Sequence, residues 1–206
     1  MRHLFATILL TLSALSSAMA NVADMEPTLA DPNELTLDEN IATPQVPEKR
    51  KELVKSFMRA KAKELAAKHL NVEILRHGEV FAVVIPASDL FLPNDTLLRS
   101  DAAVKAKLNH LKPLFDTAGR YKMIIVAHSD DTGNEAYRLA LTEKRVSALF
   151  DWFDSNFVNT ESIYGYGAGS DIPLKSNATA AGRKANRRVE IYIVPDTPLI
   201  ESLRRK

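Results

Sequence analysis

The sequence predicts an α+β fold, an α/β sandwich in which helices cover a mixed sheet. Two β-rich runs, 72–76 and 79–85, meet at His77-Gly78 and suggest a hairpin. The apolar run 121–127 (YKMIIVA) has the length and β-branched content of a buried strand, and a polar turn and a helical pattern follow it. In 187–194 apolar and polar residues alternate, as in a strand that is buried on one face.

Helices are expected between these strands. Ser100-Asp101 offers an N-cap for a helix with apolar positions at Val104, Leu108, Leu111 and Phe115, which Pro113 should kink or end. A second helix follows Gly133 and runs to about Asn156, and a short strand covers 162–167. Residues 87–98 are expected to be irregular, and 179–186 to form a short helical turn. Together these elements predict one domain over 71–195 and a tail at 196–206.

The overall composition is that of a globular protein and excludes several classes of function. The chain has 206 residues, of which 46% are hydrophobic and 26% charged, with a net charge of +1. This balance predicts no nucleic acid and no anionic membrane surface as a partner. The absence of cysteine excludes disulfides, thiolate metal sites, a cysteine nucleophile and a lipid anchor on cysteine.

The first 20 residues have the pattern of a secretory signal peptide. Arg2 and His3 precede the apolar run 4–15, and Ala18 and Ala20 form the small-residue cleavage site. The apolar run is short of the roughly 20 residues that span a bilayer. We therefore expect an exported, periplasmic chain that retains no integral membrane segment, possesses no net charge after loss of Arg2, and associates with the outer membrane or the cell wall.

Two segments of opposite charge precede the domain. Residues 21–47 contain six acidic residues, no Lys or Arg and four prolines, which predicts an acidic flexible linker. Residues 48–70 contain eight Lys or Arg with apolar residues at helical spacing, which predicts a basic amphipathic helix. That helix could contact a membrane or an envelope protein partner through Glu48 to His69, or it could pack its apolar stripe on the following domain, and the second interpretation is favoured.

The polar stretch 128–145, HSDDTGNEAYRLALTEKR, is the main candidate site. His128, Ser129 and Asp130 are the residue types of a serine hydrolase, but consecutive side chains at a strand end alternate between faces and cannot form the relay. His128 lacks a second histidine at ligand spacing, so no metal is predicted. The glycines at 165, 167 and 169 match a phosphate loop only weakly. No catalytic residue and no cofactor is therefore expected.

The remaining candidates are opposite charges on neighbouring elements. They are the carboxylates Asp130 and Asp131 in the turn, and the guanidinium groups of Arg145, Arg183, Arg187 and Arg188. On composition alone these groups would form surface salt bridges, each worth about 0 to 1 kcal/mol.

Two separate motifs resemble the family of OmpA-like peptidoglycan-binding domains. The family pattern H-T-D-x-x-G, Tyr-Asn, Leu-Ser, Arg-Ala is matched at His128, Asp130, Gly133, Tyr137, Leu141 and Arg145. The second motif, G-R-x-x-N-R-R-V-E, is matched by 182–190, and the resemblance covers about 72–194. It implies the family's β-α-β-α-β-β domain.

The resemblance also implies a function and a site. Members of the family hold the diaminopimelate residue of the peptidoglycan stem peptide without covalent chemistry, so Asp130 would bind the ligand's ammonium and Arg145 its carboxylate. A planar guanidinium suits a carboxylate, and an aspartate in a turn of N–H groups stays ionised. The complete expected ligand-binding set is Asp130, Thr132, Gly133, Arg138, Arg145, Asn186, Arg187 and Arg188.

Four positions depart from the family pattern. Thr142 for serine and Val146 for alanine are conservative changes, whereas the other two concern affinity or ligand preference more than fold. Arg138 stands where the family has asparagine, and Leu92 stands at an acidic position, for which Asp89 or Asp95 could substitute. We expect a non-enzymatic protein that binds peptidoglycan in the periplasm and anchors an envelope complex to the cell wall. The alternatives are an interaction module of an envelope or motor assembly with a weakened pocket and, more distantly, a cell-wall enzyme.

Overall fold

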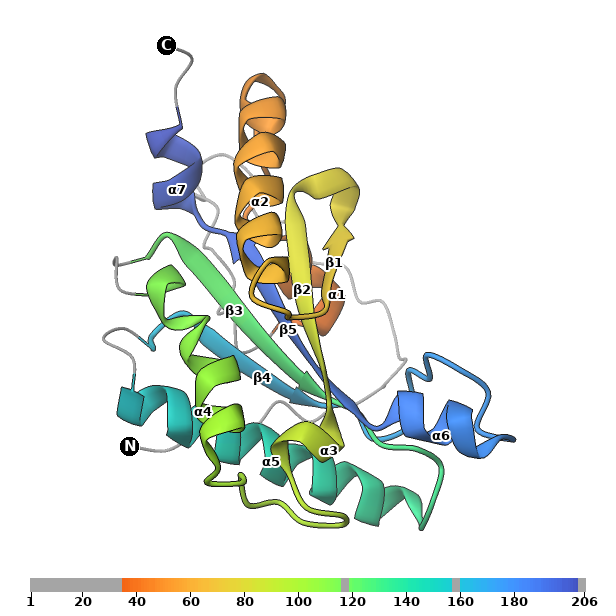
Figure 1. The fold of residues 1–206 in the computed structure, drawn as a ribbon. Coiled ribbons are helices and arrows are strands. Elements are labelled where there is room, and N and C mark those ends of the chain that lie inside the picture. Colours follow the sequence, from red (N-terminus) through yellow and green to blue (C-terminus); the bar gives the residue numbers. More distant parts are fainter. Residues whose placement is uncertain (1–34, 116–118, 157–159, 204–206) are drawn as a thin grey trace, which may run out of the picture.

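The structure is a computed structural model that describes residues 35–115, 119–156 and 160–203. The expected signal peptide and residues 21–34 of the expected linker lie outside the described residues. Figure 1 shows a single sheet with helices on both sides. Its helices are α1 (Leu37–Ala42), α2 (Lys51–Ala66), α3 (Ala87–Leu90), α4 (Ala102–Asn109), α5 (Glu135–Asn156), α6 (Ala180–Asn186) and α7 (Thr197–Ser202).

The sheet contains five strands in the order β1-β2-β5-β3-β4. The β3–β4 pair is parallel and the other three pairs are antiparallel. The predicted α+β class and mixed sheet are therefore confirmed, and the last strand in sequence lies at the middle of the sheet. The strands are β1 (Val72–Leu75), β2 (Val80–Pro86), β3 (Tyr121–Ala127), β4 (Ile163–Gly167) and β5 (Arg188–Pro195).

One face of the sheet carries the main core. Alternate residues of β2, β3 and β5 point to this face, where α2, α4, α5 and α7 cover them. The four predicted apolar positions of the α4 region are all buried here, and Asp101 caps α4 by accepting a hydrogen bond from Val104 N at 3.0 Å. Pro113 lies in a 3₁₀ turn just beyond the helix end. This face therefore follows the apolar pattern of the sequence.

The opposite face is partly covered by α1, which corrects the expectation of a linker that runs unstructured to Pro47. Leu37 and Ile41 pack against a smaller apolar cluster on this face, and Asn40 is fully buried and donates to Tyr166 Oη at 2.9 Å. Thr36 and Glu39 form a capping box at the start of the helix. Prolines and acidic residues suggested disorder, but a local cap and tertiary burial stabilise this turn of helix.

The basic helix and the C-terminal tail also belong to the main core. Val54, Met58 and Leu65 of α2 are buried, and Arg59 donates to the His77 carbonyl at 2.7 Å. In α7, Leu199 is buried in the same core. Residues 48–70 and 196–202 are thus packed parts of the domain, as the favoured interpretation of α2 predicts, because their apolar stripes complete its core.

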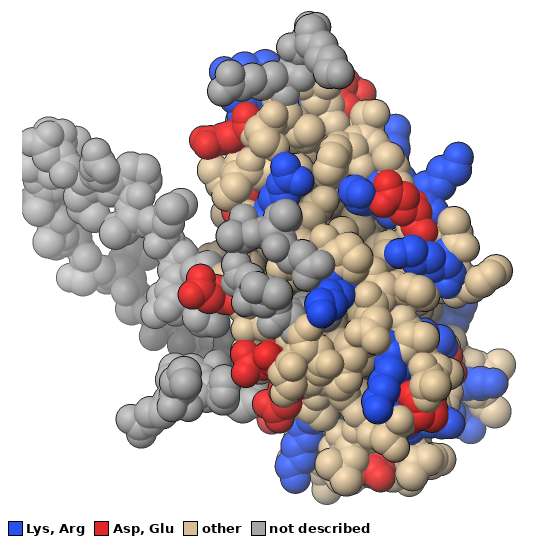
Figure 2. All heavy atoms as spheres, turned by 60° about the vertical axis from the view of Figure 1, so that its left-hand side comes forward, with Lys and Arg blue, Asp and Glu red and all other residues tan. Residues whose placement is uncertain are grey.

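The surface mixes both signs of charge. Figure 2 shows Lys and Arg side chains interspersed with Asp and Glu on the face it presents. Several basic residues of α2 pair with acidic residues three positions away, as Lys55 does with Glu52 at 2.8 Å and Lys61 with Glu64 at 2.8 Å. Among the described residues, the helices are all too short or too polar to span a membrane.

Candidate functional site

The candidate site lies at one end of the central strands, where β2 and β3 finish and β5 begins. Both β2 and β3 run antiparallel to β5, so their carboxyl ends meet the start of β5. Ala87 N donates to the Arg187 carbonyl at 2.9 Å, and His128 N donates to the Arg188 carbonyl at 2.9 Å. Three segments that are far apart in sequence are thereby brought together.

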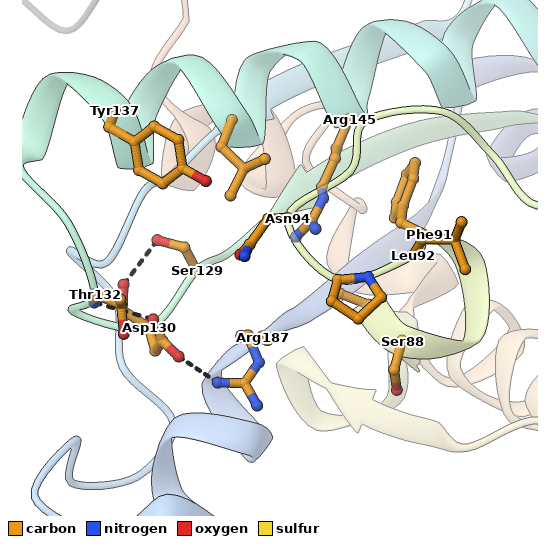
Figure 3. Close-up of a pocket in the computed structure, with 13 residues that line it drawn as sticks. Ser88, Phe91, Leu92, Asn94, Ser129, Asp130, Thr132, Tyr137, Arg145 and Arg187 are labelled. Atoms are coloured by element: carbon orange, nitrogen blue, oxygen red, sulfur yellow. Dashed lines mark hydrogen bonds and ion pairs between the residues drawn. The ribbon is translucent and has the colours of Figure 1, made fainter.

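A pocket of about 420 Å³ opens at this end of the strands, and Figure 3 shows the side chains that surround it. Helix α5 forms one wall with three residues spaced by four, so that they share one face of the helix. The loop after β2, the turn after β3 and the residue before β5 form the remainder. The lining residues are Ala87, Ser88, Phe91, Leu92, Pro93, Asn94, Ser129, Asp130, Thr132, Tyr137, Leu141, Arg145 and Arg187.

Asp130 provides a buried carboxylate in this pocket. It is 5% exposed, accepts a hydrogen bond from Thr132 N at 3.0 Å and pairs with the Arg187 guanidinium. Burial opposes ionisation of the Asp130 carboxyl, but the hydrogen bonds from Thr132 and the pairing with Arg187 outweigh it, so its pKa is lowered. Asp130 is therefore ionised at neutral pH and can attract a cation.

Arg145 provides a buried cation on the facing wall. It is 4% exposed, and its Nε donates to the Asp95 carbonyl at 3.0 Å. Its guanidinium carbon lies 5.0 Å from the centre of the Phe91 ring, which is a cation–π distance. Among the described residues, no carboxylate forms an ion pair with Arg145. Burial lowers its pKa, as expected for a cation without a counter-ion.

Several residues of the pocket were not singled out as ligand contacts in the sequence. Asn94 is turned toward the pocket in Figure 3, in a left-handed backbone conformation with φ of 56°. Tyr137 and Leu141 form the helix wall, and both match the family motif. The spacing of four residues between Tyr137, Leu141 and Arg145 could have identified this wall from the sequence. The loop that carries Phe91 and Asn94 has no periodic pattern, so the sequence offered no comparable signal there.

Thr132 and Gly133 shape the turn beside Asp130. Thr132 lines the pocket and anchors the carboxylate through its backbone N–H. Gly133 lies outside the lining, with φ of 86°, and a Cβ there would lie 2.8 Å from Tyr137 Cδ1. The glycine is thus required for backbone geometry and for the close approach of the tyrosine ring.

Arg138 lies outside the pocket lining, so its expected contact with a ligand stays a prediction. Its Nη1 donates to the carbonyls of Gly133 and Asp131, so the guanidinium closes its own turn. A long side chain one residue after Tyr137 points to a different side of α5 from the pocket wall. Its contribution to the site is to hold the turn that carries Asp130.

Asn186 and Arg188 also lie outside the pocket lining, and their expected contact with a ligand stays a prediction. Asn186 is fully buried and binds the loop before α6, donating to the Lys175 carbonyl at 2.8 Å and accepting from Lys175 N at 2.9 Å. Arg188 is buried and donates from Nε to Glu190 Oε1 at 2.6 Å. Alternation along β5 directs Arg187 to the pocket and Arg188 away from it.

The two acidic substitutes considered for Leu92 do not enter the pocket with their carboxylates. Asp89 pairs with Lys107, and Asp95 accepts hydrogen bonds from the N–H groups of Thr96 and Leu97 at 2.7 and 2.9 Å. Leu92 itself lines the pocket and is 55% exposed. The wall at this position is therefore apolar.

The catalytic-looking triplet does not form a relay. His128 is buried with its Nε2 3.5 Å from Glu190 Oε2, while Ser129 Oγ donates to the Asp130 carbonyl at 2.9 Å. The three side chains have different partners, as strand alternation predicts. Within the described ranges, no group of three His, Asp or Glu residues is arranged to hold a metal ion.

Comparisons with known proteins agree with this fold. The chain is 42% identical over 72 residues to outer membrane protein A of Bordetella avium, which covers 35% of this chain and 37% of that protein. It is 36% identical over 72 residues to the peptidoglycan-binding protein ArfA of Mycobacterium tuberculosis, which covers 35% of this chain and 22% of that protein. The chain thus spans well under half the length of these relatives. No protein-family model matches it.

Solved structures show the same fold. A MotB-like protein from Desulfovibrio vulgaris superposes with a TM-score of 0.58 at 20% identity, covering 73% of this chain and 97% of that one. The cell wall anchor of the T6SS from Pseudomonas aeruginosa superposes with a TM-score of 0.54 at 23% identity, covering 67% and 96%. The described residues share the fold of these two structures, and the match to outer membrane protein A confirms the resemblance to OmpA-like domains.

Proposed function

We propose that this protein binds peptidoglycan non-covalently in the periplasm, through the diaminopimelate residue of the stem peptide, and anchors an envelope complex to the cell wall. The observation that carries the proposal is Arg145, a buried guanidinium that forms no ion pair with a described carboxylate, in a pocket that also presents the Asp130 carboxylate. A buried cation is costly unless a counter-ion is supplied. A ligand carboxylate would supply it.

The pocket suits the amino-acid end of such a ligand. Asp130 would bind the ammonium group, and Arg145 would bind the adjacent carboxylate through its planar fork. Leu141, Phe91 and Leu92 provide apolar walls for the methylene chain. The relative that is named a peptidoglycan-binding protein supports peptidoglycan as the polymer that is bound. Affinity for one stem peptide is expected to be modest, with retention gained from many ligands along the polymer.

The test is cosedimentation of the purified protein with isolated peptidoglycan sacculi. Wild type should pellet with the sacculi, while Arg145→Met and Asp130→Asn should stay in the supernatant. Free diaminopimelate should release the bound wild type. A lost charge-assisted hydrogen bond is worth about 1.5 to 3 kcal/mol, so each variant should lose on the order of tenfold or more in affinity.

Lys144→Met is a matched control, since it removes one charge from the exposed neighbour of Arg145 on the same helix. This variant should bind as wild type does. Wild type that remains in the supernatant would contradict the proposal, and release of soluble muropeptides from the sacculi would indicate an enzyme.

One observation favours a second candidate, an interaction module with a weakened pocket. Asp130 is paired with Arg187, so a ligand ammonium has to compete with a guanidinium. In that case the exposed polar side of α2, within Glu48 to His69, would contact an envelope protein, because its apolar stripe is occupied by the core. Failure to bind sacculi together with recovery of a specific envelope partner would support this candidate.

A further inference from the structure

The pocket carries an uneven set of charges. The charged residues among its lining are the guanidinium groups of Arg145 and Arg187 and the carboxylate of Asp130, so its formal charge is +1. A ligand with one ammonium and one carboxylate neutralises Asp130 and Arg145 and leaves Arg187 without a partner. Complementarity therefore requires a second negative group on the ligand.

Arg187 and Asp130 differ in how firmly they are held. The Asp130 side chain is 7% exposed and accepts a hydrogen bond from Thr132 N. The Arg187 side chain is 46% exposed at the mouth of the pocket. Figure 3 shows the Arg187 guanidinium reaching Asp130 from the start of β5. Among the described residues, Asp130 is the partner to which that guanidinium donates.

The backbone of Arg187 is anchored, so only its side chain can move. Its N–H donates to the Arg183 carbonyl at 3.1 Å, and its carbonyl accepts from Ala87 N at 2.9 Å. One oxygen of Asp130 accepts from Thr132 and the other from Arg187. An ammonium that approaches Asp130 therefore meets Arg187, and the exposed arginine is the group that can turn away.

We propose that Arg187 is an exchangeable counter-ion, which neutralises Asp130 and transfers to a second carboxylate of the ligand when a ligand ammonium takes its place. The inference rests on the proposed function and specifies its ligand class: one ammonium with two carboxylates. It corrects the simple clamp of Asp130 and Arg145 by adding a third charged contact.

This ligand class corresponds to an uncrosslinked stem peptide. Its diaminopimelate retains a free ammonium and the carboxylate next to it, and the carboxyl end of the stem supplies the second carboxylate. A cross-link acylates the ammonium and removes the group that Asp130 binds. Amidation of either carboxylate removes the partner of one arginine, so the pocket selects free, unamidated stems.

Two small ligands that differ by one carboxylate test the inference. Meso-diaminopimelate acetylated at its L-centre amine has one ammonium and two carboxylates. Nε-acetyl-D-lysine has the same amino-acid end and the same acetamide but lacks the second carboxylate. Titration calorimetry with the full chain should show that wild type binds the dicarboxylate about tenfold or more tightly than the lysine derivative, as expected for a charged hydrogen bond.

Arg187→Gln should affect the binding of the two ligands differently. The affinity for the dicarboxylate should fall by about tenfold, because the second carboxylate loses its partner. The affinity for the lysine derivative should stay the same or increase, because no ion pair at Asp130 has to be broken when the ligand ammonium binds. Lys184→Gln, which removes one exposed charge from the neighbouring α6, is the matched control and should leave the preference of wild type intact.

Equal weakening of both ligands by Arg187→Gln would overturn the inference, since it would show that Arg187 only supports the shape of the pocket. No effect on either ligand would overturn it as well. Wild type that binds neither ligand, and does not pellet with sacculi, would instead overturn the proposed function. Thermal unfolding of Arg187→Gln at the wild-type temperature excludes misfolding as the cause of any loss.

Discussion

Buried charges behind the start of β5 show how single residues support the pocket without touching it. Glu190 accepts from Arg188 Nε at 2.6 Å and from the Tyr192 hydroxyl, and His128 lies 3.5 Å away. Burial opposes ionisation of Glu190, but the nearby His128 imidazole, the hydrogen bond from Tyr192 and the charge of Arg188 outweigh it and place its pKa at about 2. This network holds Arg188, and hence its neighbour Arg187, in place.

The lowered pKa of Glu190 makes stability depend on pH. Because the folded-state pKa lies below the ordinary value of 4.5, the stabilisation is complete above pH 4.5 and is lost as the pH falls toward about 2. Between these pH values, the free energy of unfolding of wild type should fall by about 3 kcal/mol more than that of Glu190→Gln, which cannot ionise. Urea unfolding of both proteins at pH 5, 4, 3 and 2 measures this difference.

Asp151→Asn is the control, since Asp151 is exposed on α5 and its loss should leave the pH profile of wild type unchanged. Parallel stability curves for wild type and Glu190→Gln would show that the network contributes nothing to stability in acid.

Close packing of α5 on β4 decides where the helix wall of the pocket stands. A Cβ on Gly165 would lie 2.3 Å from Val146 Cγ1, and a Cβ on Gly167 would lie 2.7 Å from the backbone N of Glu143. Gly169 N donates to the Thr142 hydroxyl at 3.0 Å. These glycines, which matched a phosphate loop only weakly in the sequence, allow the helix to lie directly on the strand.

Alanine at the two strand glycines should therefore have different consequences. The methyl group of Gly165→Ala would clash with the end of the Val146 side chain, so adding Val146→Ala should relieve that clash in the double variant. Gly167→Ala meets backbone, so it should displace α5, with Arg145, and overpacking of this kind costs about 1 to 3 kcal/mol. Diaminopimelate affinity and urea unfolding of the single and double variants measure both effects.

Glu143→Ala in the Gly167→Ala background is the contrasting pair. It removes the Cγ of Glu143 but should not restore binding, because the backbone N and Cα of residue 143 would still obstruct the new methyl group. Restoration of affinity by this second substitution would show that α5 is not held at the distance that Gly167 sets.

The molecule as a whole folds around one core that extends beyond the predicted boundaries of 71–195. Four residues of α2 are buried on the sheet, and Leu199 and Ile200 of α7 join them. Arg50, just before α2, donates to the Ile200 carbonyl at 2.8 Å and connects the two helices. Both ends of the described chain therefore contribute to the stability of the binding domain.

A truncated chain that starts at Asn71 should fail to fold cooperatively. It lacks Val54, Met58, Ala62 and Leu65, and the loss of a single large core side chain costs about 2 to 5 kcal/mol. The summed loss of all four side chains is comparable to the roughly 5 to 15 kcal/mol by which a typical domain is stable. A chain that starts at Leu35 retains α1 and α2 and should unfold cooperatively in urea. A single, unshifted transition in the shorter chain would contradict this prediction.

Local pattern was sufficient for most of the elements. The run of apolar, β-branched residues at 121–127 predicted β3 at its observed bounds, and Asp101 was correctly identified as the cap of α4. Asp130 and Arg145 were selected through the family motifs, and the structure places both in one pocket. These features are local because periodicity and capping depend on neighbours within a few residues.

Strand pairing and burial decided the remainder. The partnership of Arg187 with Asp130 depends on the register of β5 against β2 and β3, which joins residues 57 positions apart. The same register turns Arg188 to the opposite side, and α1 forms where the sequence predicted a linker because the sheet offers it an apolar face. The sequence by itself determined which charges the site contains. Only the tertiary structure decided which of them face the ligand, because contacts between distant segments are set by the pairing of whole strands.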